Sequence, residues 1–338
     1  MTLDLHFQSL ADLARLPWFG LQDDRLVLTD PTVGPILDMH THLALAYVRP
    51  MQLDLQKSSQ WVEHYLPACC PLHLDVYVNE NFTPQQLTAM KKDLTLGSLT
   101  AGGMRATHTV PNLSREMTEM GISHSVILPI DFPVLSHNTE HAMAAVKENS
   151  RFIAFCSVHP LALDAMARLD RFTAMGARGI KVHPTVQVIR PDMDAAMRLY
   201  RACGERGLIV LWHCGPVGIE PALGRYLSQV RFYEQPIAQN PGTTFVLGHA
   251  GARQVEEAIV LLNRYPNVWV EVSNQGVGAI AALLERGDPN RVLYGTDWPF
   301  YHQGVALAKV LLATQDRPDW RRKVLWDNAA RLLQLPPA

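Results

Sequence analysis

The chain has 338 residues, of which 48% are hydrophobic and 18% charged, and its formal net charge at pH 7 is −2. A chain of this length can bury a large core as one α/β domain or divide into two domains. The near-neutral charge argues against a nucleic-acid or anionic-membrane partner, and no stretch is apolar for long enough to predict a membrane span. The five irregularly spaced cysteines are typical of reduced thiols, so we expect a cytoplasmic protein.

Residues 1–35 are predicted to cover the main fold. Leu10, Leu13 and Leu16 would form the apolar face of a short helix, and residues 25–28 have the pattern of a small strand. The segment has acidic residues near its start and lacks the basic-then-apolar pattern of a secretory signal. We therefore expect it to pack onto the rest of the chain.

Residues 36–43 form the first strand predicted for the main fold. Side chains at positions i and i+2 of a strand point to the same face, so His40 and His42 are expected to aim two imidazoles at one point. Imidazole nitrogen binds zinc and several other divalent ions. The pair alone fits two hydrogen-bonded or solvated histidines equally well, and a metal site needs further ligands from elsewhere in the chain.

The alternation of strands and helices is missing between residues 44 and 121, which predicts a long insertion that forms a lid. This stretch contains several groups able to bind metal, namely His64, Cys69, Cys70 and His73. Because no CxxC-type spacing is present, these residues are more typical of buried thiols and surface imidazoles than of a second metal site.

Beyond residue 121, short apolar runs alternate with helical patterns. The runs lie at residues 125–130, 152–158, 177–182, 208–212, 244–247, 268–272 and 292–294. Short continuous apolar strands separated by helices indicate a parallel sheet covered by helices. Together with the histidine strand they make eight, which predicts an α/β fold of the (β/α)8 TIM-barrel type with a long insertion after the first strand. A doubly wound open sheet is the structural alternative.

Polar residues follow the ends of several predicted strands. Lys181 and His183 end the fourth strand, His213 the fifth, His249 the sixth and Asp297 the eighth. In a barrel these strand ends meet at one mouth, so we expect these side chains to converge with the histidine pair of the first strand. Three imidazoles and a carboxylate suit a divalent ion with one position open for water. A further histidine beside them is suited to remove a proton from that water.

Six short motifs resemble the amidohydrolase superfamily, and within it the amidohydrolase-related branch that includes aminocarboxymuconate-semialdehyde decarboxylase. They are DMHTH at 38–42, GIKVHP at 179–184, LWHCG at 211–215, LGHAG at 247–251, LYGTDWPF at 293–300 and NAARLL at 328–333. The resemblance implies a (β/α)8 barrel over one domain, one zinc ion in most members and often a homodimer. By it, His40, His42, His213 and Asp297 look like the metal ligands, and His249 and Asp297 like the catalytic residues.

Further residues are candidates for substrate-binding or supporting roles. Lys181, which shares a strand face with His183, would face a substrate carboxylate or, if carboxylated, bridge two metal ions; we favour one ion. Asp38 is expected beneath the histidine pair, where it would hold an imidazole in place. His159 and His302 follow the third and eighth strands, where they would contact the substrate or lie in solvated loops.

The function we expect is hydrolysis of a C–O or C–N bond in a small, carboxylated organic substrate by a metal-activated water. Zinc-dependent non-oxidative decarboxylation of an aromatic or unsaturated acid uses nearly the same residues and is the alternative. Residues 276–281 match a GxGxxA dinucleotide pattern, but too little sequence follows for a nucleotide-binding half, and a turn that opens a helix is the simpler interpretation. A non-enzymatic barrel is disfavoured because the set of metal ligands looks complete.

Overall fold

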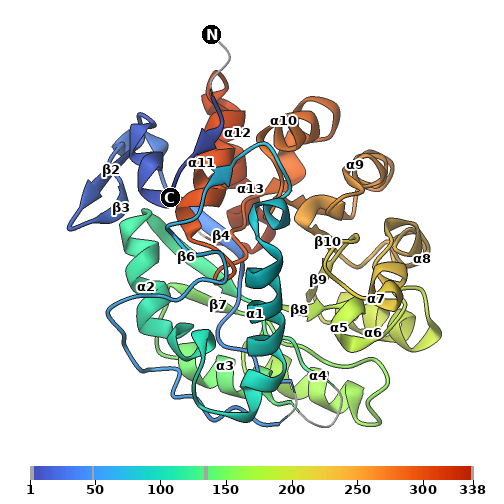
Figure 1. The fold of residues 1–338 in the computed structure, drawn as a ribbon. Helices are drawn as coiled ribbons and strands as arrows, with labels where there is room; N and C mark the ends of the chain where they lie inside the picture. Colours follow the sequence, from blue (N-terminus) through green and yellow to red (C-terminus); the bar gives the residue numbers. More distant parts are fainter. Residues whose placement is uncertain (1–3, 48, 133–135, 336–338) are drawn as a thin grey trace.

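The computed structural model describes residues 4–47, 49–132 and 136–335. Within these residues, eight parallel strands form a barrel enclosed by helices, as the strand–helix alternation predicted (Figure 1). The barrel strands are β4 (Ile36–Thr41), β6 (Ile122–Ile127), β7 (Phe152–Ala154), β8 (Gly179–Val182), β9 (Ile209–His213), β10 (Phe245–Gly248), β11 (Val268–Glu271) and β12 (Val292–Leu293).

Two parallel sheets and the contacts between their edges make up the barrel. One sheet has the order β4-β6-β7 and the other the order β12-β11-β10-β9-β8. A parallel bridge between Cys156 and Ile180 joins the sheets along one seam. Along the other seam, the amide of Asp297 donates to the carbonyl of His40 over 2.7 Å. The chain is therefore a closed barrel rather than a doubly wound open sheet, and the second seam joins the histidine strand directly to the loop that carries Asp297.

Helices follow each barrel strand and also form the C-terminal part of the chain. They are α1 (Pro84–Leu94), α2 (Val110–Glu119), α3 (Asn138–Val146), α4 (Ala165–Ala174), α5 (Pro184–Gln187), α6 (Asp194–Glu205), α7 (Ala222–Leu227), α8 (Glu234–Gln239), α9 (Val255–Arg264), α10 (Val277–Arg286), α11 (Gln303–Ala313), α12 (Pro318–Arg322) and α13 (Asn328–Leu332). Among the described residues, no helix combines the length and the apolar character needed to cross a membrane.

The barrel strands are apolar on both faces. Alternate residues such as Leu211 belong to one buried cluster, which includes Trp326 and Ala329 from the end of the chain. The residues between them, such as Val210, belong to a larger cluster with the surrounding helices. Because successive side chains of a strand point to opposite faces, burial on both sides makes each strand a continuous apolar run. This is the pattern that made the strands recognisable in the sequence.

The N-terminal segment is paired with the insertion that follows β4. β1 (His6–Phe7) pairs antiparallel with β5 (Leu72–His73) of the insertion. β2 (Phe19–Gln22) and β3 (Arg25–Leu28) form a hairpin, which includes the small strand predicted there. Residues Leu10–Arg15 form a 3-10 helix where the sequence predicted a short amphipathic helix.

The insertion is fastened internally by a buried arginine and a buried aspartate. The guanidinium of Arg105 donates to the carbonyls of Leu45 (3.2 Å) and Gly97 (2.8 Å). The carboxylate of Asp93 accepts hydrogen bonds from the amides of Met104 and Arg105, each over 3.1 Å. These contacts fix the segment after α1, and Figure 1 shows α1, in teal, crossing in front of the barrel strands.

The GxGxxA segment is a packing contact between the insertion and the barrel. Gly276 is the residue before α10, and a Cβ atom there would lie 2.4 Å from the carbonyl oxygen of Asp75. The amide of Val277 donates to the carbonyl of Leu74 over 3.1 Å. The first glycine is therefore needed for close approach of two backbones, which supports the interpretation as a turn that opens a helix.

The histidines and cysteines of the insertion are dispersed rather than clustered. His64 Nε2 lies 3.0 Å from Glu116 Oε2. The ring of His73 stacks on that of His6 with centroids 3.9 Å apart, and Cys70 Sγ accepts a hydrogen bond from Gln86. Cys69 is exposed and Cys70 half-buried, whereas His64 is buried, so the expectation of buried thiols and surface imidazoles is wrong for these three residues.

Candidate metal centre

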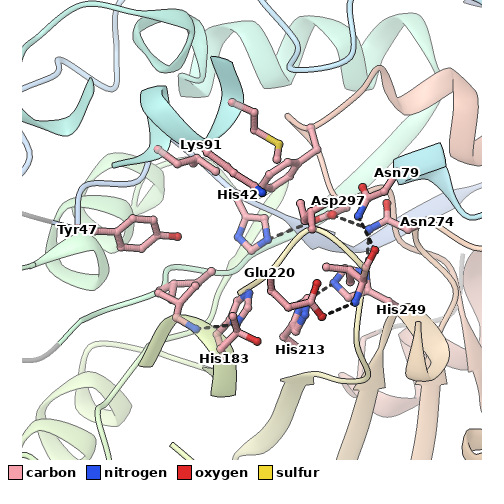
Figure 2. A pocket seen from close by; sticks show the side chains of 18 of the residues that line it. His42, Tyr47, Asn79, Lys91, His183, His213, Glu220, His249, Asn274 and Asp297 are labelled. Carbon is pink, nitrogen blue, oxygen red and sulfur yellow. Dashed lines mark hydrogen bonds and ion pairs between the residues drawn. The ribbon is translucent and has the colours of Figure 1, made fainter. Parts of the chain in front are cut away.

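The carboxyl ends of the barrel strands and part of the insertion surround a cavity of about 900 Å³. Figure 2 shows side chains that line it. Seven residues expected at the mouth from the sequence line this cavity, namely His40, His42, Lys181, His183, His213, His249 and Asp297. Side chains that are scattered through more than 250 residues of sequence thus face one space, as a barrel requires.

A buried carboxylate holds the ring of His40 from its Nδ1 side. Nδ1 lies 2.6 Å from Oε2 of Glu271, the last residue of β11, and both side chains are fully buried. A proton shared between these two atoms leaves Nε2 of His40 with a lone pair, the arrangement found for histidines that bind metals. Nε2 also lies 3.0 Å from Lys181 Nζ. Burial, followed by the charge of Lys181, keeps the pKa of His40 well below its usual value, so the ring is neutral at pH 7.

The ring of His42 is held by a carbonyl group. Its Nδ1 donates to the carbonyl of Leu128 over 2.6 Å, which again leaves Nε2 as the free nitrogen. The Nε2 atoms of His42 and His40 lie 3.3 Å and 3.6 Å from the same oxygen, Asp297 Oδ1. Two ligands that share a zinc ion at tetrahedral geometry are separated by about 3.4 Å. These three donor atoms therefore fit a divalent ion.

The carboxylate of Asp297 is oriented through its second oxygen. Asn274 Nδ2 donates to Oδ2 over 2.8 Å. Asn274 is itself fixed, because the hydroxyl of Tyr301 donates to its Oδ1 and accepts from its backbone amide over 2.9 Å. Both Asn274 and Asp297 have left-handed backbones, with φ of 70° and 60°. Because Asn274 hydrogen-bonds to Oδ2 of Asp297, the other oxygen, Oδ1, faces the two imidazoles.

His249 and His213 form a pair beside this group. His249 Nε2 lies 3.1 Å from His213 Nδ1, and His249 Nδ1 lies 2.7 Å from the hydroxyl of Ser273. The ring of His213 stacks on that of His183 with centroids 3.9 Å apart. Burial holds the pKa values of His249, His213 and His183 well below the usual value, so all three rings are neutral at pH 7. His213 thus lies in the cavity, with its Nδ1 directed to His249.

Asp38 was expected to hold an imidazole in place, but it supports the site in a different way. Its carboxylate does not contact the imidazole of His40; Oδ1 accepts from the backbone amides of His40 and Thr296, each over 3.0 Å. Oδ2 accepts from the side chain of Gln303 on α11 over 3.0 Å. The register of β4 is irregular between positions 38 and 41, so the simple i, i+2 alternation fails here. Glu271, not Asp38, holds the imidazole.

His159 and His302 do not line the cavity among the described residues, contrary to the expectation that they contact the substrate. His159 Nε2 is 2.8 Å from the carbonyl of Gln187, so this histidine ties the loop after β7 to the end of α5. His302 precedes α11, where its Nδ1 accepts from the amide of Gly304 over 3.0 Å. His302 Nδ1 also lies 3.8 Å from Oε1 of Glu116 on α2. A histidine that follows a strand can contact the substrate or cap the next helix, and its position in the sequence does not distinguish these two roles.

Sequence reasoning missed three polar residues of the cavity and its walls. Glu271, Asn274 and Glu220 are all buried. Glu271 did carry a signal, because an acidic side chain inside the apolar run 268–272 needs a buried partner. The other two lie in loops, and nothing in the local sequence separates them from ordinary turn residues.

The protein-family model of the amidohydrolases matches residues 37–335 of the chain. The chain belongs to the amidohydrolase family. This confirms the superfamily predicted from the six motifs and the enzyme class that it implies, in which hydrolases and decarboxylases both occur. Members of the family depend on divalent metal ions, and the His40, His42 and Asp297 side chains are arranged to hold one.

Comparison with individual proteins agrees with this family membership. A curated relative, 4-sulfomuconolactone hydrolase from Hydrogenophaga intermedia, is 27% identical over 213 residues, covering 56% of this chain and 67% of the relative. Among solved structures, an uncharacterised TIM-barrel protein from Bordetella bronchiseptica superposes with a TM-score of 0.62 at 19% identity, covering 89% of this chain and 99% of that one. The 5-carboxyvanillate decarboxylase from Novosphingobium aromaticivorans, solved with manganese, has a TM-score of 0.59 at 16% identity, with coverage of 91% and 98%. These structural likenesses confirm the TIM-barrel fold.

Proposed function

We propose that this amidohydrolase-family enzyme hydrolyses a C–O or C–N bond at the carbonyl of a small, carboxylated organic substrate. The observation that carries the proposal is the convergence of His40 Nε2, His42 Nε2 and Asp297 Oδ1, with both imidazoles fixed through Nδ1. The relative from Hydrogenophaga intermedia is described as a lactone hydrolase. Lactones are therefore the substrates to test first.

In this proposal His40, His42 and Asp297 hold one zinc ion, and His213 supplies the fourth ligand. Imidazole nitrogen and carboxylate oxygen are ligands that zinc accepts, although manganese uses the same atoms. When bound, such an ion supplies Lewis acidity and makes water a competent nucleophile at neutral pH. Lys181 stays an amine that faces the substrate; burial lowers its pKa to about 8. A ratio near two metal ions per chain by elemental analysis would instead indicate a carboxylated lysine between two ions.

Proton transfer is assigned to His249 and Asp297. His249 is neutral, buried and in the same cavity as the metal-binding group, so its ring can accept a proton during attack on the carbonyl. The hydroxyl of Ser273 at Nδ1 orients that ring. Asp297 would take the second proton of the attacking water from the hydroxyl added to the carbonyl carbon and carry it to the leaving group.

We further propose that residues 1–35 cover the barrel and residues 44–121 form the lid of the site, within one domain spanning 1–338. What supports this is that Val78, Met90 and Lys91, all from the insertion, line the cavity. A homodimer and a cytoplasmic location complete the proposal. The five free cysteines are in keeping with a reducing compartment.

The decisive experiment assays the purified chain after metal removal and after reloading with zinc or manganese. The substrate panel contains lactones, amides and aromatic carboxylic acids. The expected result is metal-dependent hydrolysis with net consumption of water. His249→Asn and Asp297→Asn should each abolish turnover, whereas Glu285→Gln, on an exposed part of α10, should not.

Two results would contradict the proposal. Release of carbon dioxide without net water consumption would identify a decarboxylase, the alternative that uses nearly the same residues. Full turnover in either the His249 or the Asp297 variant would mean that the site is assigned to the wrong residues.

A further inference from the structure

The cavity contains a buried carboxylate, Glu220, that the proposed hydrolysis does not use. Glu220 lies on the loop between β9 and α7, is only 8% exposed, and lines the same cavity as the metal-binding group. Figure 2 shows it among His183, His213 and His249. Because this acidic side chain is part of the cavity wall, it affects which ligands the cavity can bind.

Only one of the two carboxylate oxygens of Glu220 has a partner. Oε1 accepts a hydrogen bond from the amide of Val217 over 2.8 Å. Oε2 is buried and has no hydrogen-bond partner among the described residues. A buried charged oxygen without a partner is unfavourable, and such groups are rare in native proteins unless they serve a function.

The backbone of the loop that carries Glu220 is held from two sides, and Oε1 of Glu220 is tied to it through the amide of Val217. Gly215 has φ of 84°, and a Cβ atom there would lie 1.9 Å from the carbonyl oxygen of Gly251 in the neighbouring loop. From the insertion, Asn79 Nδ2 donates to the carbonyl of Val217 over 3.2 Å. The unpaired oxygen is therefore fixed in advance of binding, which is how binding sites reduce the entropy lost when a ligand is ordered.

We propose that Oε2 of Glu220 binds a hydrogen-bond donor, a hydroxyl or an ammonium group, carried by the substrate. The inference rests on the proposed hydrolysis and narrows its substrate class. The reacting carbonyl lies at His40, His42 and Asp297, and the donor group lies at Glu220. A site built to bind a donor discriminates strongly against an analogue that lacks it, because the buried oxygen is then left unpaired.

Three lactones of the same ring size test the proposal: γ-butyrolactone and its α-hydroxy and α-amino derivatives. With the metal-loaded full chain, kcat/KM for the derivatives should exceed that for the parent lactone by about tenfold or more. Glu220→Gln keeps an acceptor oxygen but loses the charge, so the preference for the ammonium derivative should fall more than that for the hydroxyl derivative. Glu220→Leu should abolish both preferences. Glu285→Gln, which removes an exposed charge, should retain them.

An unfolding measurement keeps the test independent of turnover. Removing an unpaired buried charge should leave the thermal midpoint of Glu220→Gln equal to that of the parent chain or raise it by about 1–3 °C. A fall of several degrees would show that the carboxylate is satisfied within the protein and would overturn the proposal. Ratios of kcat/KM that do not change in Glu220→Gln would overturn it as well. Failure of the metal-loaded parent chain to hydrolyse any lactone or amide, including those of the wider panel, would instead contradict the proposed hydrolysis, and the unfolding midpoint would still decide the role of Glu220.

Discussion

One side-chain amide, that of Asn274, connects the two residues assigned to proton transfer. Its Nδ2 donates to Asp297 Oδ2 over 2.8 Å and lies 3.2 Å from His249 Nδ1. Tyr301 fixes the amide from the other end. The asparagine thus decides which oxygen of Asp297 faces the imidazoles, although it belongs to none of the motifs that identify the family.

Replacing Asn274 with Asp tests this role at the residue scale. The substitution keeps the size and the tolerance for a left-handed backbone but places a second carboxylate against Asp297, where a donor is needed. We expect kcat to fall by about 10- to 100-fold with a smaller change in KM. Steady-state kinetics on the metal-loaded enzyme checks this, with the exposed Asn263→Asp as a control that should behave like the parent chain. An unchanged kcat would show that Asp297 keeps its orientation without the amide.

Glu271→Gln tests the carboxylate behind His40. Replacing the carboxyl group that pairs with Nδ1 by an amide should weaken metal binding by about 10- to 100-fold, as changes to groups behind metal-binding histidines typically do. Competition with a chromophoric chelator measures the affinity directly. Equal affinities for the variant and the parent chain would contradict the assignment of His40 Nε2 as a ligand atom.

Much of the cavity could be predicted from the sequence because its residues follow the ends of recognisable strands. His40, His42, His213, His249 and Asp297 all do so, and all line the cavity. The residues that orient them could not be found in this way. Glu271 is 231 positions from the histidine that it holds, and Asn274 lies in a loop whose path depends on tertiary contacts. Local periodicity carries no information about partners at such separations.

At the scale of elements, the eight strands were predictable because burial on both faces gives continuous apolar runs, and each run overlaps a barrel strand. The insertion was recognised only because the alternation of strands and helices is missing from it. Its helix α1 could not be assigned to the cavity from sequence, because that placement depends on side-chain contacts such as those of Asp93, near the end of α1, with Tyr65 and Arg105. His302 does follow the eighth strand, as predicted, but its place before α11 was not recognised from the sequence.

Helix α11 contains a buried lysine that should make stability depend on pH. Burial lowers the pKa of Lys309 to about 7, with Asp75 partly opposing the shift; its Nζ donates to the carbonyl of Val76 over 3.2 Å. A lysine in the unfolded chain titrates near 10.5. Between these two values the unfolded state binds more protons than the folded state, so the free energy of unfolding should rise with pH.

The rise should amount to about 2–3 kcal/mol between pH 7 and 9. Lys309→Met should remove that contribution and increase stability at pH 6. Urea unfolding at pH 6, 7 and 9 measures both effects, and Lys57→Met, at an exposed position, should keep the pH dependence of the parent chain. A parallel pH profile for the Lys309 variant would show that the amine is charged in the folded state throughout this range.

For the whole molecule, metal binding and folding should be coupled. The donor atoms of His40, His42 and Asp297 come from β4 and from the loop after β12, at opposite ends of the sequence. They are close together only in the folded barrel. An ion that binds the folded state alone stabilises it by about 2.7 kcal/mol at a free concentration of 100 times Kd.

The thermal midpoint of the metal-free chain should therefore rise with added zinc and continue to rise with its logarithm. His42→Ala should lose most of this increase while the chain remains folded. Differential scanning calorimetry across a zinc titration checks the prediction. A midpoint that is insensitive to zinc in the parent chain would contradict a folded-state site on these strands.

The wall of the cavity that comes from α1 is encoded by one short contiguous stretch. Thr88, Met90, Lys91, Lys92, Leu94 and Thr95 line the cavity from this segment. The ligand atoms are encoded elsewhere, on the strands and the loops that follow them. A combinatorial library restricted to these six positions, which leaves the buried Asp93 in place, would therefore vary the shape offered to a substrate while leaving the metal-binding residues intact. Replacing α1 with the corresponding helix of a relative would likewise transfer the substrate preference of that relative without changing the type of reaction.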